Sequence, residues 1–338
     1  MLKKVIGALA AATLISTAVA GPAQAAGETI NSGGASYTFA LQQVCTQAYT
    51  EDKVTYNSVG SGTGKTNFRN GTYDFGGSDS LYGPTEAKPA KFVYVPLLGG
   101  PVTIAFNLPG VTRVNLTPKL IGDIYVGKVT KWNDAAIKAI NKTTNLPDLT
   151  IVPAYRSDNS GTSNNFTNWL RVKYGAPFKQ NDSFATGVGS DLVKGSLSGR
   201  GNSGVATTIK STVGAMGYID LADANKEGLN YAHVQNASGQ FIKPTVANSK
   251  LFLEKMNLKA SGEIVFDYNA KIRGAYDLTL ASYGLAPTAN GTSKAKAVAD
   301  YLKFFVNTCS QQNAAALGYV ALSGTMLRKA NEQIAKIK

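Results

Sequence analysis

The residues most able to do chemistry form a Ser-Gly-Thr turn at the start of a predicted helix. A predicted strand ends at Arg156, and Ser160 then stands where it would cap the helix that follows. The backbone N–H groups of Gly161 and Thr162 would have no partner inside that helix, so they could donate to an oxyanion. The Arg156 guanidinium could add a planar fork of donors. The alternative is an ordinary capped helix in which Arg156 pairs with Asp158.

Two other segments have a similar pattern of Gly, Ser and Thr before a helix. One leads from a strand into GSGTGKT, with Ser61 at the predicted helix start. This string is one residue short of a nucleotide-binding loop, because Val59 occupies the position that needs glycine. The other segment, GGASYTF, offers the Thr38 hydroxyl and the Phe39 amide as neutral donors. Thr38 could equally be a simple helix cap.

Asp79 follows a predicted strand in the string YDFGGSDS and distinguishes between anions. A carboxylate repels an anion unless the anion brings a proton to donate. Phosphate carries such a proton near neutral pH and sulfate does not, so Asp79 would favour phosphate. A binder of sulfate or molybdate is the closest alternative, and Asp79 could also be a plain turn residue.

The sequence gives little support for an enzyme. It contains a single histidine, His233, and it has no GxSxG motif. Neither a metal-ligand cluster nor a cofactor motif is present, so we expect no catalytic residue, no metal and no cofactor. A secreted phosphatase-like enzyme and a signalling or adhesive protein remain the alternatives from other classes.

The amino terminus predicts export. Lys3 and Lys4 precede an apolar run that ends in Ala23-Gln24-Ala25, a pattern typical of a signal peptide cleaved near Ala25. The apolar run is shorter than the roughly 18 residues that a membrane-spanning helix needs. No cysteine occurs before Cys45, so no lipid acceptor is expected at the mature amino terminus. We therefore expect a periplasmic protein.

Length and charge set further limits. The chain has 338 residues, and its net charge falls from +13 to +11 once Lys3 and Lys4 are removed with the leader. The basic residues are scattered, so nucleic acid is not an expected partner. The length suits two domains.

Cys45 and Cys309 would meet oxidising conditions after export, yet their spacing alone leaves open whether they form a disulfide.

The expected elements alternate between strands and helices, which indicates an α/β fold. The predicted strands are residues 54–59, 92–96, 102–107, 151–156 and 215–219. The first helix should bury one face, formed by Leu41, Val44, Cys45, Ala48 and Tyr49.

Local signals also predict where helices begin and where the chain changes direction. Thr117-Pro118 should start a second helix, and Asn133 should cap a third. Gly99-Gly100 lies between two strand-like runs, where we expect a flexible joint between two domains.

Taken together, the motifs resemble the periplasmic phosphate-binding proteins of Pst-type ABC transporters, the PstS family. The strings that carry this resemblance are TF at 38–39, GSGTG at 60–64, FGGSD at 75–79, IGDIYVGKVTKWND at 121–134, RSDNSGTS at 156–163 and GNSGVATTI at 201–209. The sequence departs from the family pattern at Tyr37, Gly62 and Thr63, and it aligns poorly over 174–199 and 250–272.

The resemblance implies a fold, a site and partners. The fold would be α/β, a two-domain periplasmic binding protein fold of the class II type, with a ligand cleft between the domains and a hinge. Domain I would comprise 26–99 plus 275–338, and domain II 100–274. The phosphate contacts would come from Thr38, Phe39, Ser61, Asp79, Arg156, Ser160, Gly161 and Thr162, with Asp158 supporting Arg156. A monomer would deliver phosphate to the permease subunits and ATPase of the transporter.

Overall fold

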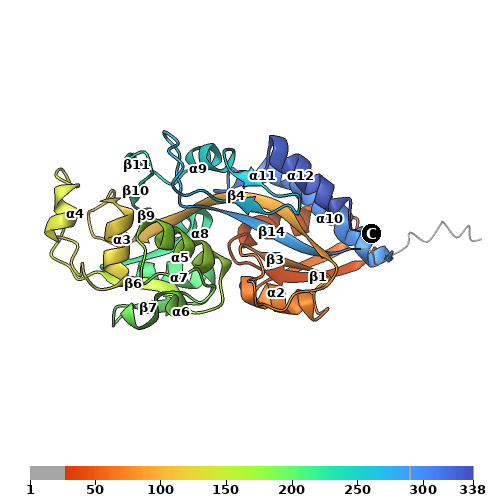
Figure 1. The fold of residues 1–338 in the computed structure, drawn as a ribbon, viewed down its shortest axis with the longest axis horizontal. Coiled ribbons are helices and arrows are strands. Elements are labelled where there is room, and N and C mark those ends of the chain that lie inside the picture. Colours follow the sequence, from red (N-terminus) through yellow and green to blue (C-terminus); the bar gives the residue numbers. More distant parts are fainter. Residues whose placement is uncertain (1–26, 289–290, 338) are drawn as a thin grey trace, which may run out of the picture.

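The computed structural model describes residues 27–288 and 291–337 (Figure 1). The predicted signal peptide lies outside the described residues. No helix in the described part of the chain is both long and apolar enough to cross a membrane.

One large mixed sheet runs through the molecule. Its strand order is β2-β1-β3-β14-β4-β8-β6-β7, and β15 and β9 also pair with β4. Its strands are β1 (Thr29–Gly34), β2 (Lys53–Ser58), β3 (Phe75–Ser78), β4 (Phe92–Phe106), β6 (Val152–Arg156), β7 (Leu197–Gly199), β8 (Ala215–Asp220), β9 (Asn230–Tyr231), β14 (Thr279–Pro287) and β15 (Val320–Ala321). The predicted strands are all confirmed, although the runs at 92–96 and 102–107 form a single strand.

Strand β4 divides this sheet into two parts. Its first part pairs with β14 and β15, whereas residues 102–106 pair with β8. We call the part with β1, β2, β3, β14 and β15 the first lobe, and the part with β6, β7, β8 and β9 the second lobe. Figure 1 shows the first lobe on the right and the second on the left.

Helices cover both lobes. Those of the first lobe are α1 (Phe39–Ala48), α2 (Ser61–Arg69), α10 (Ser293–Phe304), a π-helix (Phe305–Cys309), α11 (Ser310–Asn313) and α12 (Gly324–Ile334). Those of the second lobe are α3 (Pro118–Tyr125), α4 (Ala135–Ala139), α5 (Gly161–Lys173), α6 (Phe184–Val188), a 3-10 helix (Gly189–Asp191), α7 (Gly201–Ser211) and α8 (Leu221–Lys226). Helix α9 (Val246–Leu253) packs against β4, β14 and β15.

Two small sheets complete the fold. One has the order β11-β10-β5, with strands β5 (Asn115–Leu116), β10 (His233–Gln235) and β11 (Phe241–Ile242). The other pairs β12 (Asn257–Leu258) with β13 (Ile264–Val265).

The helix starts follow the local sequence signals closely. Thr117 caps α3 by accepting from the Leu120 amide, with proline next in the chain, as predicted. The prediction that Asn133 caps the next helix is wrong by one residue. The Asp134 side chain accepts from the Ala136 amide at 2.8 Å, because a carboxylate satisfies a free amide at least as well as an amide oxygen.

The predicted joint at Gly99-Gly100 lies inside strand β4, where the chain passes from the first lobe to the second. Strand β4 continues through both residues without a break. A Cβ on Gly99 would lie 2.6 Å from Leu253 Cδ2, and one on Gly100 would lie 2.5 Å from the Tyr37 hydroxyl. These glycines therefore allow close packing of the shared strand.

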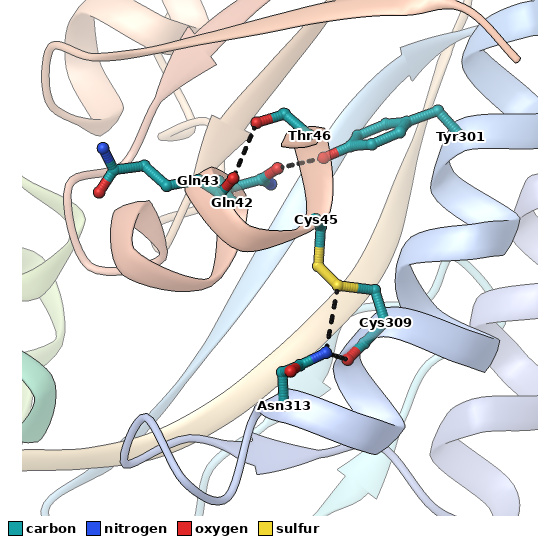
Figure 2. The surroundings of a disulfide bond; sticks show 7 residues. All are labelled: Gln42, Gln43, Cys45, Thr46, Tyr301, Cys309 and Asn313. Atoms are coloured by element: carbon teal, nitrogen blue, oxygen red, sulfur yellow. Dashed lines mark hydrogen bonds between the residues drawn. A yellow bond between two sulfur atoms is a disulfide. The ribbon is translucent and has the colours of Figure 1, made fainter. Parts of the chain in front are cut away.

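A disulfide joins Cys45 to Cys309, at a Cα–Cα distance of 5.7 Å, which answers the question that the sequence left open. Figure 2 shows the bridge between α1 and the end of the π-helix, with Asn313 donating to the Cys309 carbonyl at 2.9 Å. On the predicted face of α1, Leu41 and Cys45 are fully buried, but Ala48 is exposed.

Candidate functional site

The predicted anion-binding residues meet where the two lobes face each other. Helices α1 and α2 begin there from the first lobe, and α5 and α7 begin there from the second. A Cβ on Gly161 would lie only 2.5 Å from Ser61 Oγ and 2.7 Å from Asp79 Cβ. The lobes are therefore closed on each other, and only glycine fits at the start of α5.

Helix α5 directs its free amides toward this site. The Ser160 hydroxyl accepts from the Ser163 amide at 3.2 Å and so caps the helix. Among the described residues, the Gly161 and Thr162 amides have no protein acceptor. Free N–H groups and the positive end of the helix dipole together favour a negative charge here.

Arg156 is held rigidly at the end of β6. Its Nε and Nη2 donate to the two Asp158 oxygens at 2.8 and 2.6 Å, and its Nη1 donates to Asn202 Oδ1 at 3.1 Å. Burial opposes ionisation of Asp158, but the Arg156 hydrogen bonds and charge hold its pKa below the usual value. A guanidinium has five N–H donors, so two remain for a ligand. Arg156 can therefore pair with Asp158 and still donate to an anion.

Asp79 faces this donor set from the first lobe. Its side chain is 4% exposed, and burial raises its pKa to about 7, against the Ser282 hydrogen bond and the Arg156 charge. Ser282 donates to Oδ1 at 2.7 Å, and Thr162 donates to Oδ2 at 3.5 Å. A carboxyl group with this pKa can accept or hold a proton near neutral pH.

Ser61 completes the first-lobe side of the site beside Asp79. The Ser61 hydroxyl accepts from the Asp79 amide at 3.1 Å, which leaves its own hydrogen free to donate.

Thr38 and Phe39 already make hydrogen bonds within the first lobe. Thr38 Oγ1 lies 3.3 Å from both the Ala35 carbonyl and the Tyr56 hydroxyl. The Phe39 amide donates to the Ser36 carbonyl at 3.2 Å, and the phenyl ring lines a cavity of about 720 Å³ between the lobes. In this conformation the Phe39 amide is therefore engaged within its own turn.

Four residues of the site escaped the sequence predictions. Asn202, at the start of α7, bonds Arg156 and lies 3.5 Å from Thr162 Oγ1, and Ser282 bonds Asp79. The Asn165 Nδ2 donates to the Asp79 carbonyl at 2.6 Å, and the Ser36 hydroxyl accepts from the Asn202 amide at 3.2 Å. Asn202 and Ser36 had a signal, because they belong to the strings GNSGVATTI and GGASYTF.

A buried ion pair also joins the lobes beside the site. Lys65, 2% exposed on α2, lies 2.9 Å from Asp182 of the second lobe and 2.8 Å from Glu86 of the first. The Ser80 hydroxyl adds a bond to Asp182 at 3.2 Å. We call Lys65, Ser80 and Asp182 the interlobe latch.

The described residues offer little for metal or imidazole chemistry at this site. No three His, Cys, Asp or Glu side chains within 27–288 and 291–337 gather as a metal site would require. His233 lies on β10 and lines a separate cavity of the second lobe.

Comparisons with known proteins agree with this architecture. Residues 14–308 match the family model of a PBP superfamily domain. The phosphate-binding protein PstS of Xylella fastidiosa strain Temecula1 is 33% identical over 309 residues, covering 89% of this chain and 83% of that protein.

Solved structures show the same fold. A high-affinity periplasmic phosphate-binding protein bound with phosphate has a TM-score of 0.73 at 22% identity, covering 90% of this chain and 93% of that one. An ABC-type phosphate transport receptor from Vibrio cholerae has a TM-score of 0.56 at 20% identity, covering 86% and 99%. The predicted two-domain α/β binding-protein fold is confirmed.

Proposed function

The chain belongs to the PBP superfamily and, within it, to the PstS phosphate-binding proteins, and from this premise we propose that it captures inorganic phosphate between its lobes. One observation carries the proposal. The free amides of α5 and the rigid Arg156 fork face Asp79, a buried carboxyl group with a pKa of about 7. Donors for an oxyanion thus stand opposite an acceptor for its proton.

This arrangement would select phosphate over sulfate. The P–OH group of phosphate would donate to ionised Asp79, while the other oxygens accept from Gly161, Thr162 and Arg156. Sulfate has no proton to give near neutral pH, so it would face an unpaired carboxylate. The remaining predicted contacts, Thr38, Phe39, Ser61 and Ser160, would complete the shell.

Capture would involve closure of the two lobes about a hinge. We propose domain I as 26–99 plus 275–338 and domain II as 100–274. Two features support this division. Strand β4 pairs with strands of both lobes, and the chain returns to the first lobe with β14, which begins at Thr279. Asn165 and Ser36 bond across the cleft, and these bonds would stabilise the closed conformation.

Delivery would be to an ABC-type phosphate transporter, because a structural relative is a transport receptor of that type. We propose that the protein is exported to the periplasm after cleavage near Ala25. It would act there as a monomeric binding protein, without catalysis, and dock on the permease subunits served by the ATPase.

Calorimetric titration of the mature, ligand-stripped protein tests the proposal. We expect tight binding of phosphate and no heat with sulfate. Arg156→Gln should weaken phosphate binding at least about 30-fold, because losing one partner of a buried charge pair costs about 2–5 kcal/mol. Arg171→Gln is the matched control, since Arg171 is exposed and its side chain bonds Asn168, outside the proposed site. Equal binding of both anions, or of neither, would contradict the proposal.

A further inference from the structure

Three cationic or protonatable side chains gather at one end of the small sheet β11-β10-β5. Strand β10 runs parallel to β5, with His233 opposite Asn115, and antiparallel to β11, with Val234 opposite Ile242. Arg113 therefore precedes β5 at the same end where His233 begins β10 and Lys243 follows β11. The strand topology, and no sequence motif, brings these residues together.

The three side chains line one cavity of about 430 Å³, which we call the strand-end pocket. Its other lining side chains include Thr112, Asn225, Asn230 and Tyr231, and none of the lining residues is Asp or Glu. The Lys243 Nζ lies 5.8 Å from the centre of the Tyr231 ring. The pocket thus combines cations with hydroxyl and amide groups that can donate hydrogen bonds.

The cations of this pocket have no carboxylate partner in the part of the chain that the structure describes. Among the described residues, neither Arg113 nor Lys243 lies within ion-pair distance of a carboxylate, unlike the lysines of the interlobe latch and of α10. Burial and the charges of Arg113 and Lys243 lower the pKa of His233. Like charges held together in a concave site raise the local potential and favour an anion.

The volume of the pocket indicates the size of the anion that it could hold. A neighbouring hollow of about 320 Å³ shares Arg113 and adds Lys142, so the positive surface continues beyond the pocket. Cavities of some 300–1,000 Å³ typically hold small organic ligands, which exceed a single inorganic phosphate.

We propose that the strand-end pocket binds a phosphate group of a larger molecule, either a soluble condensed phosphate or the headgroup of an anionic lipid. Arg113 and Lys243 would contact the phosphate oxygens, and His233 would join them when protonated. The pocket shares no residue with the proposed phosphate site between the lobes. The inference therefore goes beyond the proposed function and does not depend on it.

His233 makes the proposal directly measurable, because it is the only histidine of the chain. Its ring gives a single imidazole signal in the proton NMR spectrum of the untagged protein. Tripolyphosphate is titrated with inorganic phosphate in excess, so that the cleft between the lobes is already filled. We expect a saturable shift of the His233 signal and a rise in its pKa, because the anion offsets the Arg113 and Lys243 charges. Besides His233, the titratable side chains of the lining are Arg113, Lys243 and Tyr231.

Matched double variants separate a site from general charge attraction. Arg113→Gln with Lys243→Gln should weaken tripolyphosphate binding at least about tenfold, since both variants remove charged donors to the phosphate oxygens. Lys53→Gln with Lys88→Gln removes the same charge from exposed positions of the first lobe and should leave the affinity unchanged. Equal weakening in both double variants would overturn the proposal.

A second arm identifies the source of the phosphate group. The protein is sedimented with phosphatidylglycerol vesicles and, for comparison, with phosphatidylcholine vesicles. Binding to the anionic vesicles that is lost with Arg113→Gln and Lys243→Gln assigns the pocket to lipid headgroups. A response to tripolyphosphate alone assigns it to soluble phosphates. No response in either arm overturns the proposal.

Discussion

At the scale of single residues, Asp79 links protonation to the closed conformation. Its pKa rises from 3.8 to about 7 when it is buried against the second lobe. Between these two pH values a closed, ligand-free protein therefore keeps a proton that the unfolded chain releases. Its stability is greatest below the unfolded pKa and falls as the pH rises through about 7.

The variant Asp79→Asn should remove this dependence. The two proteins should be equally stable near pH 4, and the variant should be more stable at pH 8 by at most roughly 4 kcal/mol, since each pKa unit corresponds to about 1.36 kcal/mol. Urea unfolding in phosphate-free buffer at several pH values measures the difference. Asp191→Asn, at an exposed carboxyl group, is the control. A parallel pH profile for wild type and Asp79→Asn would rule out this role.

The sequence predicted the part of the site that is local in the chain. The turn from Arg156 to Thr162 depends on neighbouring residues, so its capping serine and free amides were predictable. Ser282 was not, because it lies 203 residues from Asp79, and only the pairing of β14 with β3 and β4 brings it there. A serine in a strand carries no sign of such a partner.

At the scale of elements, helix α2 and the segment around Asp182 hold the lobes together. Lys65 is shared between Glu86 of its own lobe and Asp182 of the other, so opening would leave it with one carboxylate instead of two. The pair with Asp182 forms only when the lobes close. It should therefore slow the release of phosphate and have little effect on its capture.

Asp182→Asn should accelerate phosphate release roughly tenfold, which corresponds to about 1.4 kcal/mol. Lys65 keeps Glu86 as a partner, so the loss stays moderate. Stopped-flow fluorescence with a competing phosphate trap measures the release rate. Asp148→Asn is the control, because its pair with Lys131 is exposed on the second lobe. An unchanged release rate for Asp182→Asn would refute the latch.

The elements themselves were predictable where the pattern is periodic. Strands β2, β6 and β8 lie within one residue of their predicted positions at each end. The close packing at Gly99-Gly100 was not predictable, since a glycine that permits flexibility and a glycine that permits close packing look alike in a sequence. Only the fold brings Leu253 and Tyr37 against these two residues.

At the scale of the whole molecule, the disulfide lies in the first lobe and closes a loop of the chain that contains the second lobe. Cys45 and Cys309 are 264 residues apart, and the complete second lobe lies between them in the chain. Constraining so long a loop reduces the entropy of the unfolded chain.

The double variant Cys45→Ala with Cys309→Ala should lose about 2–5 kcal/mol of unfolding free energy. Its affinity for phosphate should change little, because the bridge lies between α1 and the π-helix, away from Arg156 and Asp79. Urea unfolding and calorimetry measure the two quantities. A loss of stability below about 1 kcal/mol would contradict the assigned role of the bridge.

The same bridge also determines how the molecule responds to mechanical force. A tension applied to the two chain ends would pass through the Cys45–Cys309 bond and bypass everything between these residues. Only the segments outside the bridge, 27–44 and 310–337, could be drawn out, while the second lobe would carry no load. Pulling on the termini would therefore load β1, together with Ser36, Thr38 and Phe39, at one end and α12 at the other, whereas Asp79 and Arg156 lie inside the bridged loop and would be spared.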